Sequence, residues 1–551
     1  MRRRTIPFLL LAAFLFGFAV ASVDNGITTA MVHQAAKLIG LDFSEKQNEM
    51  MLQGLEVNRQ AYNAIRTAGL LNQHAPALVF NPLPAGFSIP SDVSPIQWEI
   101  PANVPLPENK SDLAWYSIPE LASLIKSRKL SVEWLTGFFI ERIEKYGDTL
   151  QAVVTITRET ALAQARGADR EIAMGRYRGI LHGIPFGAKD LLAVEGYKTT
   201  WGAMPYKDQY IDQTATVIRN LDQAGAILVA KLTLGALAMG DIWYGGVTKN
   251  PWNLTQGSSG SSAGSASAVS AGLVPFAIGS ETLGSIVSPS TRCGVTGLRP
   301  TFGRVSRNGA MALSWSMDKI GPISRSAFDC AIVLSAIAGK DPADVASVDA
   351  ALVIPMPNEV KELKVGFIKK FFDADYPSAE NDRQVLTDLR NMGIKLEEVH
   401  WEFDIPVSAL RIILSAEAAA AFDELTVSKR DSMLVAQGAN AWPNIFRTSR
   451  FIPAAEYINA NRLRRLLIEE VHLLMKDFDV IVTPSFGGNQ LLVTNLTGHP
   501  CLVAPNGFNA NGSPTSISFI GNLYEEGKLV ALAAAWQQYT GHHHKRPLFF
   551  K

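Results

Sequence analysis

The chain has 551 residues, which is longer than one ordinary domain. Hydrophobic residues make up 47% of it, so the chain can bury a large core. Its 51 lysines and arginines balance its 51 aspartates and glutamates, so the net charge is zero. This balance gives no support to a nucleic-acid-binding role, which normally shows a basic excess or a basic stripe.

The first residues have the pattern of an export signal. Arg2–Arg4 form a basic start, an apolar run extends from Ile6 to about Phe18, and Ala19-Val20-Ala21 provides a small-x-small cleavage site. We therefore expect a signal peptide over residues 1–21 and an exported, periplasmic or secreted protein. An uncleaved membrane anchor is the alternative, but the apolar run is short for a span. No later stretch predicts a stable membrane span.

Residues 22–112 are expected to form an N-terminal helical extension followed by a proline-rich strap. Ser44 is followed three residues later by Gln47, which is a capping-box pattern at the start of a helix. Apolar residues then recur through that helix. Seven prolines between Pro82 and Pro107 exclude a regular helix in the strap.

Residues 113–551 have the pattern of an α/β domain. Ser117 and Ser131 precede apolar-periodic runs and are expected to cap helices. Short β-branched runs begin at residues 152, 226, 363 and 479, with helical segments between them. This alternation predicts a single large domain with a mixed, mostly parallel central β-sheet flanked by helices.

The serine-rich stretch GSSGSSAGSASAVSAG at 257–272 has several interpretations. Its composition is that of a flexible linker, but it continues without a break into a core-like apolar run. Gly260–Gly264 matches the G-x-S-x-G nucleophile elbow, yet no hydrophobic strand precedes it. Ser123–Lys126 matches the S-x-x-K pattern of penicillin-binding proteins, but it lies on a charged helical surface without a K-T-G companion.

A further interpretation uses two serines and a lysine. Lys189 stands in LHGIPFGAKDLLAVEG, between a Gly/Pro turn and an apolar segment, and is a candidate for burial. Burial disfavours the ammonium form and lowers its pKa, so a neutral amine becomes available to deprotonate a serine. Lowering the pKa from about 10.4 to 7 costs roughly 4–5 kcal/mol, which burial can supply.

These segments resemble the amidase signature family of serine hydrolases. The stretch 257–303 resembles the family's Gly/Ser-rich signature, and LHGIPFGAKD resembles its lysine motif. The segment SIPELASLIKSRKLSVEWL resembles its opening helices, and GPISRSAFDCAIVLSAIAGKDP and VTPSFGGNQLLVTNLTGHPCLVAPNG resemble its later segments. The resemblance covers about residues 113–545 with the motifs in order, and residues 23–112 lie outside it.

The resemblance implies the amidase signature fold and a Ser-cisSer-Lys triad. Ser285 matches the nucleophile, Ser261 the bridging serine 24 residues earlier, and Lys189 the base. Backbone amides of the turn Thr282-Leu283-Gly284-Ser285 would form the oxyanion hole. The family places a cis peptide before the bridging serine, where Gly260 reduces crowding.

Two departures from the family pattern bear on the substrate. Leu283 replaces the first glycine of the usual Gly-Gly-Ser turn, which reshapes the pocket but keeps the N–H group. Val287 stands where many members have an arginine that can meet a carboxylate, so we expect a neutral or apolar substrate group there. Gly260 and Val287 are the predicted substrate-binding residues.

The sequence therefore predicts an amide hydrolase that transfers an acyl group from a C–N bond to Ser285 and then to water. The expected substrate is a small-molecule amide, such as a peptide amide, an aryl amide or a fatty acyl amide, with no nucleic-acid partner. No cofactor or metal is expected. The three cysteines are too widely spaced for a zinc site, and the run His542–His544 is expected to be polar surface or packed against the core.

Two alternatives stay open. One is a glutamine- or asparagine-hydrolysing amidotransferase subunit, which the export signal, the neutral charge and Val287 disfavour. The other is a catalytically inactive binding protein, which the intact set of Lys189, Ser261 and Ser285 disfavours.

Overall fold

The computed structural model describes residues 26–90 and 96–550, so the expected signal peptide over 1–21 lies outside the described residues. The chain divides between Leu71 and Asn72 into two compact units. Residues 72–90 and 96–112 belong to the second unit, in which the indole of Trp98 donates to Ser335 at 3.0 Å. The predicted bounds of the N-terminal extension with its strap, 22–112, and of the catalytic domain, 113–551, stay predictions.

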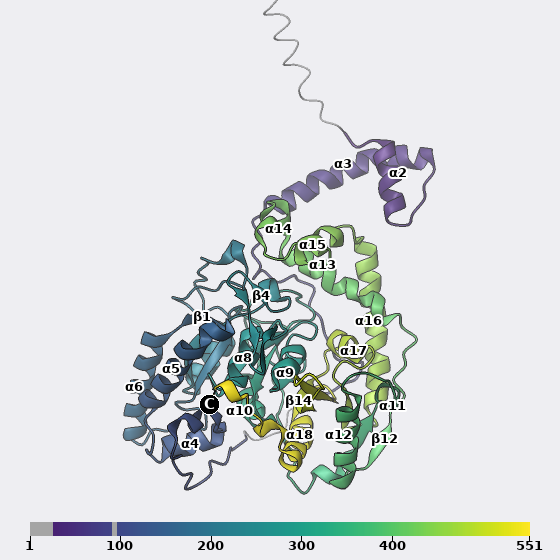
Figure 1. The fold of residues 1–551 in the computed structure, drawn as a ribbon. Helices are drawn as coiled ribbons and strands as arrows, with labels where there is room; N and C mark the ends of the chain where they lie inside the picture. Colours follow the sequence, from purple (N-terminus) through teal and green to yellow (C-terminus); the bar gives the residue numbers. More distant parts are fainter. Residues whose placement is uncertain (1–25, 91–95, 551) are drawn as a thin grey trace, which may run out of the picture. The chain divides into compact units, whose positions relative to one another are not determined.

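The first unit contains α2 (Thr29–Leu38) and α3 (Glu45–Thr67), labelled in Figure 1. The N-terminal helices that the sequence predicts are therefore present. Ser44 and Gln47 form the expected capping box at the start of α3, each side chain bonding the backbone N–H of the other. Among the described residues, no helix of either unit has both the length and the apolar character to cross a membrane.

The second unit is built on a sheet that has 11 strands within the described residues, in the order β1-β3-β2-β8-β10-β9-β14-β15-β13-β11-β12. In chain order its strands are β1 (Val153–Ile156), β2 (Pro185–Lys189), β3 (Ile227–Leu232), β8 (Phe276–Glu281), β9 (Thr296–Arg299), β10 (Lys319–Ser324), β11 (Val365–Phe367), β12 (Leu396–Glu398), β13 (Val480–Pro484), β14 (Cys501–Phe508) and β15 (Pro514–Gly521). Short strands form two separate hairpins, β4–β5 (Ile242–Trp243, Gly246–Val247) and β6–β7 (Lys249–Asn250, Asn253–Gly257).

The predicted mixed sheet flanked by helices is confirmed. Strands β3, β2 and β8 pair in parallel, and so do β13, β11 and β12. The strands between these two blocks pair antiparallel, and so does β1 at the edge. Parallel pairing is therefore concentrated in the two blocks. Between them, short connections are possible: residues 509–513 join β14 to β15, and a connection of this length can join only antiparallel neighbours.

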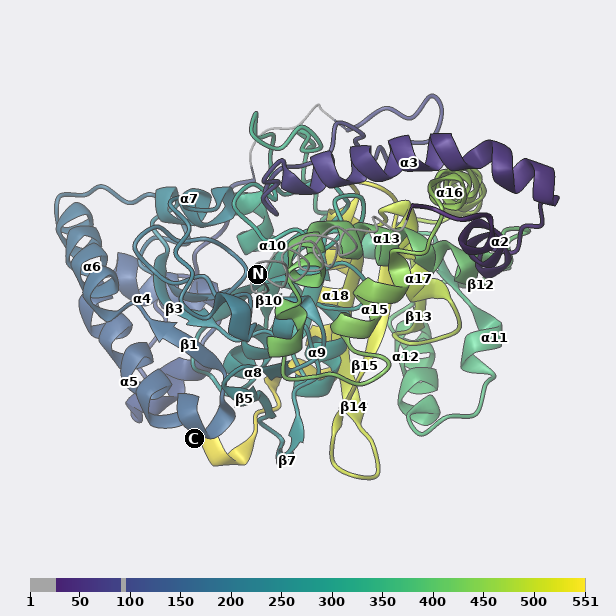
Figure 2. The same cartoon turned by 90° about the horizontal axis from the view of Figure 1, so that it is seen from above.

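Helices cover the sheet and its two ends (Figures 1 and 2). They are α4 (Ile118–Lys126), α5 (Val132–Leu150), α6 (Arg158–Ala173), α7 (Thr216–Gln223), α8 (Ala263–Ser270), α9 (Val287–Cys293), α10 (Ala327–Ile337), α11 (Lys369–Phe372), α12 (Ala379–Asn391), α13 (Ile412–Ala421), α14 (Asp423–Val427), α15 (Trp442–Ser449), α16 (Ala454–Met475), α17 (Gln490–Thr497) and α18 (Glu526–Thr540). In Figure 2, α4, α5 and α6 gather at the end that carries β1 and β3, and α11 and α12 gather at the opposite end.

Both faces of the sheet are buried. Along β14, Leu502 and Ala504 belong to the main hydrophobic cluster, whereas Cys501 and Val503 pack with Val287 of α9 on the other face. Side chains alternate between the faces of a strand, so this division shows helical layers on both sides.

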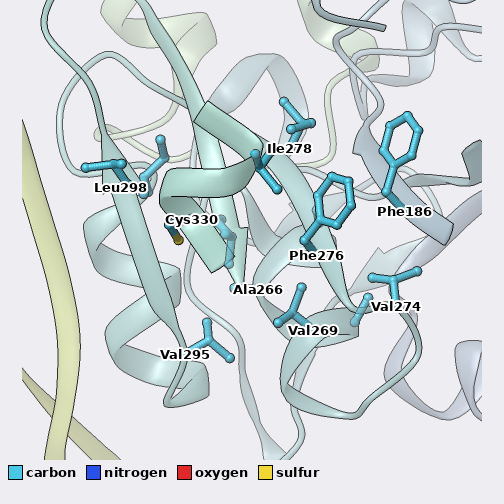
Figure 3. Packing of buried hydrophobic residues seen from close by; sticks show 14 of the residues in the cluster. Phe186, Ala266, Val269, Val274, Phe276, Ile278, Val295, Leu298 and Cys330 are labelled. Carbon is cyan, nitrogen blue, oxygen red and sulfur yellow. The ribbon is translucent and has the colours of Figure 1, made fainter. Parts of the chain in front are cut away.

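The core between α8 and β8 fixes the elements that carry the chemistry. Figure 3 shows Ala266 and Val269 of α8 beside Phe276 and Ile278 of β8. The rings of Phe276 and Phe186, which lie on the neighbouring strands β8 and β2, stack with centroids 5.4 Å apart. This packing places the C-terminal ends of β2 and β8 against the start of α8.

Candidate active site

The candidate lysine and the candidate nucleophile lie at the same edge of the sheet. Lys189 is the last residue of β2, and Glu281, four residues before Ser285, is the last residue of β8. Because β2 and β8 are parallel neighbours, their carboxyl ends meet at one edge. Carboxyl ends of parallel strands are the usual place for a ligand site in α/β proteins.

Lys189 is fully buried and hydrogen-bonded to three serines. Its Nζ donates to Oγ of Ser261 at 2.8 Å and to Oγ of Ser262 at 3.1 Å. It also donates to Oγ of Ser280 at 2.9 Å and lies 3.3 Å from the carbonyl oxygen of the same residue. Sequence analysis missed Ser280, although it stands directly before Glu281 in the same motif.

The environment of Lys189 favours its neutral form near neutral pH. Burial lowers the pKa of Lys189 to about 7, against the opposing effect of the carboxylates of Asp318 and Glu281. The Lys189 amine therefore has a proton affinity suited to taking and returning a proton at neutral pH.

Ser261 lies in a tightly packed turn just before α8. The peptide bond between Gly260 and Ser261 is cis, as the resemblance predicts. A Cβ atom on Gly260 would lie 1.8 Å from the carbonyl oxygen of Gly240, so only glycine fits at this position. The N–H of Ser259 donates to the Asp241 carboxylate at 2.8 Å. Such packing excludes the flexible-linker interpretation.

Serines within α8 attach this helix to its surroundings. The Ser265 hydroxyl donates to the carbonyl of Ile278 in β8 at 3.0 Å, and the Ser270 hydroxyl donates to the carbonyl of Cys293 at 2.6 Å. Both serines are buried. Their hydrogen bonds join the helix to the backbone of neighbouring segments inside the core.

Ser285 lies in the turn between β8 and α9 and is 8% exposed. Its carbonyl accepts a hydrogen bond from the N–H of Ser262 at 3.1 Å. The N–H groups of Leu283, Gly284 and Ser285 make no hydrogen bond to any residue in the described ranges. Gly284 has a φ of 83°, a conformation that favours glycine. The turn can therefore direct N–H groups at an oxygen of a bound substrate.

The hydroxyl of Ser285 is not part of the lysine network. No hydrogen bond joins it to Ser261 or to any other side chain among the described residues. Catalytic hydrogen bonds are often long in ligand-free sites and tighten when substrate binds. The structure thus connects Lys189 to Ser261 and leaves the Ser285 hydroxyl available for a ligand.

Glu281 holds the turn from inside. Its carboxylate accepts the N–H groups of Ile286 and Val287 at 2.8 and 3.0 Å and pairs with the guanidinium of Arg299 at 2.7 Å. The amide of Asn495 donates to the same carboxylate at 2.8 Å. Burial alone would raise the pKa of Glu281, but the Arg299 charge and these hydrogen bonds lower it to about 2.

Removing the charge of Glu281 should destabilise the fold. We expect Glu281→Gln to lower the free energy of unfolding by about 3–5 kcal/mol, because Arg299 is left buried without its counter-ion. The effect is measured by urea denaturation. Glu525→Gln, at a partly exposed pair with Lys528, is the control and should cost less than about 1 kcal/mol.

The pH dependence of this difference provides a second readout. The pKa of Glu281 is depressed in the folded chain, so its stabilisation is present above the ordinary pKa of about 4.5 and is lost as the pH falls towards 2. A difference between wild type and Glu281→Gln that stays constant over this range would contradict the assignment.

A cavity of about 100 Å³ adjoins the nucleophile turn. Ser280, Thr282 and Asp318 line one side, and apolar residues line another: Leu191, Ala238, Met311 and Leu313. The predicted substrate-binding residues Gly260 and Val287 are not among its described lining residues. Val287 is fully buried against Cys501 and Val503, because the first turn of α9 faces β14. The contacts of Gly260 and Val287 with substrate stay predictions.

Cys293, Cys330 and Cys501 are buried free thiols. Within the described part of the chain, no group of three or more His, Cys, Asp or Glu side chains is arranged to hold a metal ion.

The fold and the segments around the buried lysine define an enzyme of the amidase class. The family model described as Amidase matches residues 135–492, and the chain therefore belongs to the amidase family. The resemblance found in the sequence is confirmed.

Relatives and solved structures agree with this assignment. The chain is 33% identical to the A subunit of glutamyl-tRNA(Gln) amidotransferase from Moorella thermoacetica over 79% of this chain and 99% of the relative. It is 34% identical to the protein of the same name from Picosynechococcus, over 77% and 98% of the two chains. Its fold is similar to that of peptide amidase from Stenotrophomonas maltophilia, with a TM-score of 0.70 and 29% identity, covering 79% of this chain and 99% of the other.

The prediction of export is wrong. The curated relatives reported above, which match over more than three quarters of the chain, are A subunits of glutamyl-tRNA(Gln) amidotransferase from several bacteria, and this finding overturns the expectation of a periplasmic or secreted enzyme. A basic start before a short apolar run is too general a pattern to decide the matter alone. Export therefore no longer counts against an amidotransferase role.

Proposed function

We propose that the protein hydrolyses a carboxylic amide through an acyl-enzyme on Ser285. Lys189 is the base, and Ser261 passes the proton between it and Ser285. The observation that carries the proposal is the 2.8 Å hydrogen bond from the fully buried Nζ of Lys189 to the Ser261 hydroxyl. The lowered pKa of Lys189, about 7, supports the role because a neutral amine can accept the proton.

The proposed steps use only groups of this chain and water. As Ser285 attacks the amide carbon, its proton moves to Ser261, and the proton of Ser261 moves to Lys189. The carbonyl oxygen becomes negative and is stabilised by the N–H groups of Leu283, Gly284 and Ser285. The protons then return to the leaving nitrogen, and water cleaves the acyl-enzyme by the same route in reverse.

For the substrate, the relatives favour the side-chain amide of glutamine, the alternative that the sequence left open. Curated relatives at 33–34% identity are amidotransferase subunits. The argument from Val287 for a neutral group loses its force, because Val287 is buried against β14. We propose that the chain releases ammonia from a primary amide, with glutamine as the first candidate and with a protein partner that receives the ammonia.

A second candidate substrate is a C-terminal peptide amide. The similarity to peptide amidase and the apolar side of the cavity, with Leu191, Met311 and Leu313, favour it. Both candidates share the same bond cleavage and release of ammonia.

Ammonia release from a substrate panel distinguishes the candidates. With the purified full-length chain, we expect kcat/KM for glutamine to exceed that for a peptide amide, an aryl amide and asparagine. A higher value for the peptide amide would replace glutamine by the second candidate. No ammonia from any amide would favour the catalytically inactive alternative.

A further inference from the structure

The turn that carries Ser285 is attached to a carboxylate at each end. At its far end, the Glu281 carboxylate accepts the backbone N–H groups of residues 286–287. At its start, the Thr282 hydroxyl donates to Oδ1 of Asp318 at 2.5 Å. The N–H groups that the turn leaves free for a substrate oxygen lie between these two attachments.

The register of the sheet places Asp318 opposite Thr282. Strands β8 and β10 pair antiparallel, and Glu281 at the end of β8 lies opposite Lys319 at the start of β10. The next pair along this register is Thr282 and Asp318. The Cβ atoms of directly opposed residues lie about 4.5–5.5 Å apart, so the threonine hydroxyl can reach the carboxylate.

The loop before β10 fixes the Asp318 carboxylate. Its Oδ2 accepts the N–H groups of Leu313 and Ser314 at 2.8 and 3.0 Å. The Ser314 hydroxyl in turn donates to the carboxylate of Glu417, in α13, at 2.6 Å. Both oxygens of Asp318 therefore have donors, and the position of Thr282 depends on a loop that is itself bonded to a helix.

The same carboxylate acts on the proposed base. The charges of Asp318 and Glu281 raise the pKa of Lys189 against the larger, opposite effect of burial. Glu281 is already paired with a guanidinium, and Asp190, next to Lys189 in the chain, is paired with Lys231 at 2.7 Å. Replacing Asp318 is thus the change that removes a charge from Lys189 without breaking either of these ion pairs.

The surroundings of Asp318 support its ionised form. Burial raises the pKa of Asp318, whereas its three hydrogen-bond donors and the charge of Arg307 lower it. Arg307 itself pairs with Asp344 at 3.0 Å. Lys319, the next residue, is fully buried, and burial lowers its pKa well below the ordinary value, so its amine favours the neutral form.

We propose that Asp318 is a positioning residue for the reaction: its carboxylate holds Thr282, and with it the free N–H groups of the turn, and adds a negative charge to the surroundings of Lys189. This inference rests on the proposed amide hydrolysis and adds to it a residue outside the triad. Donors that face an oxyanion act mainly in the transition state, so a displaced turn should slow the reaction more than it weakens binding.

The experiment measures ammonia release by the full-length chain from glutamine, asparagine, a peptide amide and an aryl amide across a range of pH. For the amide that wild type hydrolyses fastest, we expect Asp318→Asn to lower kcat by about 10–100-fold and to change KM less than about threefold. The pH at which kcat/KM reaches half its plateau should fall by about 0.5–1 unit, because Lys189 then loses its proton more readily.

Thr282→Val separates the position of the turn from the charge. It removes the hydrogen bond to Asp318 but keeps the carboxylate and the shape of the side chain. We therefore expect kcat to fall by a similar factor, with the midpoint of the pH profile at its wild-type value.

Asp382→Asn, in α12, is the matched control. Asp382 is a buried carboxylate that also accepts hydrogen bonds from uncharged groups, the Tyr376 hydroxyl at 2.8 Å and the Asn506 amide at 2.6 Å. Its replacement should lower the thermal stability as Asp318→Asn does. The value of kcat should stay within about threefold of wild type, and the midpoint of the pH profile should not move.

The inference is overturned if kcat for Asp318→Asn and Thr282→Val stays within about threefold of the control, if the losses appear in KM alone, or if Asp318→Asn leaves the midpoint unmoved. Each of these results leaves amide hydrolysis standing. If Asp318→Asn does not fold, Thr282→Val decides by the same threefold limit on kcat. Failure of wild type to hydrolyse any of the four amides overturns the proposed function and the inference together.

Discussion

Replacing Ser285 by alanine should abolish amide hydrolysis and leave the fold intact. No acyl-enzyme can form without the hydroxyl, so we expect kcat to fall by at least about 10⁴-fold. The stability should change little, because the Ser285 hydroxyl makes no hydrogen bond to a described residue. Ammonia release measures the first effect and thermal unfolding the second.

Ser288, in the first turn of α9, provides the matched control. Its hydroxyl bonds that of Ser259 at 2.7 Å, so Ser288→Ala removes one hydrogen bond and should cost about 1 kcal/mol. Its kcat should stay within about tenfold of wild type. If Ser285→Ala kept more than 1% of wild-type activity, another residue would have to be the nucleophile.

Replacing Lys189 should have the second-largest effect. We expect Lys189→Met to lower kcat by about 10³–10⁴-fold, because the proton of Ser285 then has no acceptor. Lys189→Arg should be equally inactive, since a guanidinium keeps its charge at all accessible pH values. The wild-type profile should show kcat/KM rising with pH up to about 7 and then levelling, as the Lys189 ammonium loses its proton.

Stability provides an independent check of the same group. The pKa of Lys189 is about 7 in the folded chain, against an ordinary value of 10.5, so the unfolded chain binds more protons between these values. The contribution of Lys189 therefore makes stability rise with pH across this window, and Lys189→Met should remove that rise. An activity profile that is flat from pH 5.5 to 8.5 would contradict the role of Lys189 as base.

Local patterns predicted the strands whose residues favour extended structure. The β-branched runs at 152, 226, 363 and 479 became β1, β3, β11 and β13. The stretch Pro185–Lys189 has no β-branched residue, and the sequence did not predict it as a strand. It forms β2 because β3 and β8 pair with it on both sides, and such long-range pairing overrides a weak local preference.

In the candidate site, too, local motifs predicted some residues, whereas long-range contacts determine others. Lys189, Ser261 and Ser285 could be chosen because short motifs surround them, and Lys189 and Ser261 prove to be hydrogen-bonded. The bond from Thr282 to Asp318 spans 36 residues, and nothing in the local sequence marks it. Val287 was predicted to contact substrate because many members of the family have an arginine there, but only the packing of α9 on β14 decides which way its side chain points.

The same reasoning applies to Asn72, which lines the cavity beside Thr282. The contact between Asn72 and Ala312 joins residues 240 positions apart. In the sequence, Asn72 follows a helical pattern and precedes a proline-rich strap, and no motif includes it. Segments outside a recognised family region can therefore shape its pocket without leaving a local signal.

Labelling of the chain by a fluorophosphonate probe tests the central claim most directly. Such probes form a covalent adduct with an activated serine, and intact-mass measurement followed by peptide mapping locates it. We predict one adduct on Ser285 in wild type and none in Ser285→Ala. Absence of any adduct in wild type, or an adduct on a different serine, would contradict the acyl-enzyme account.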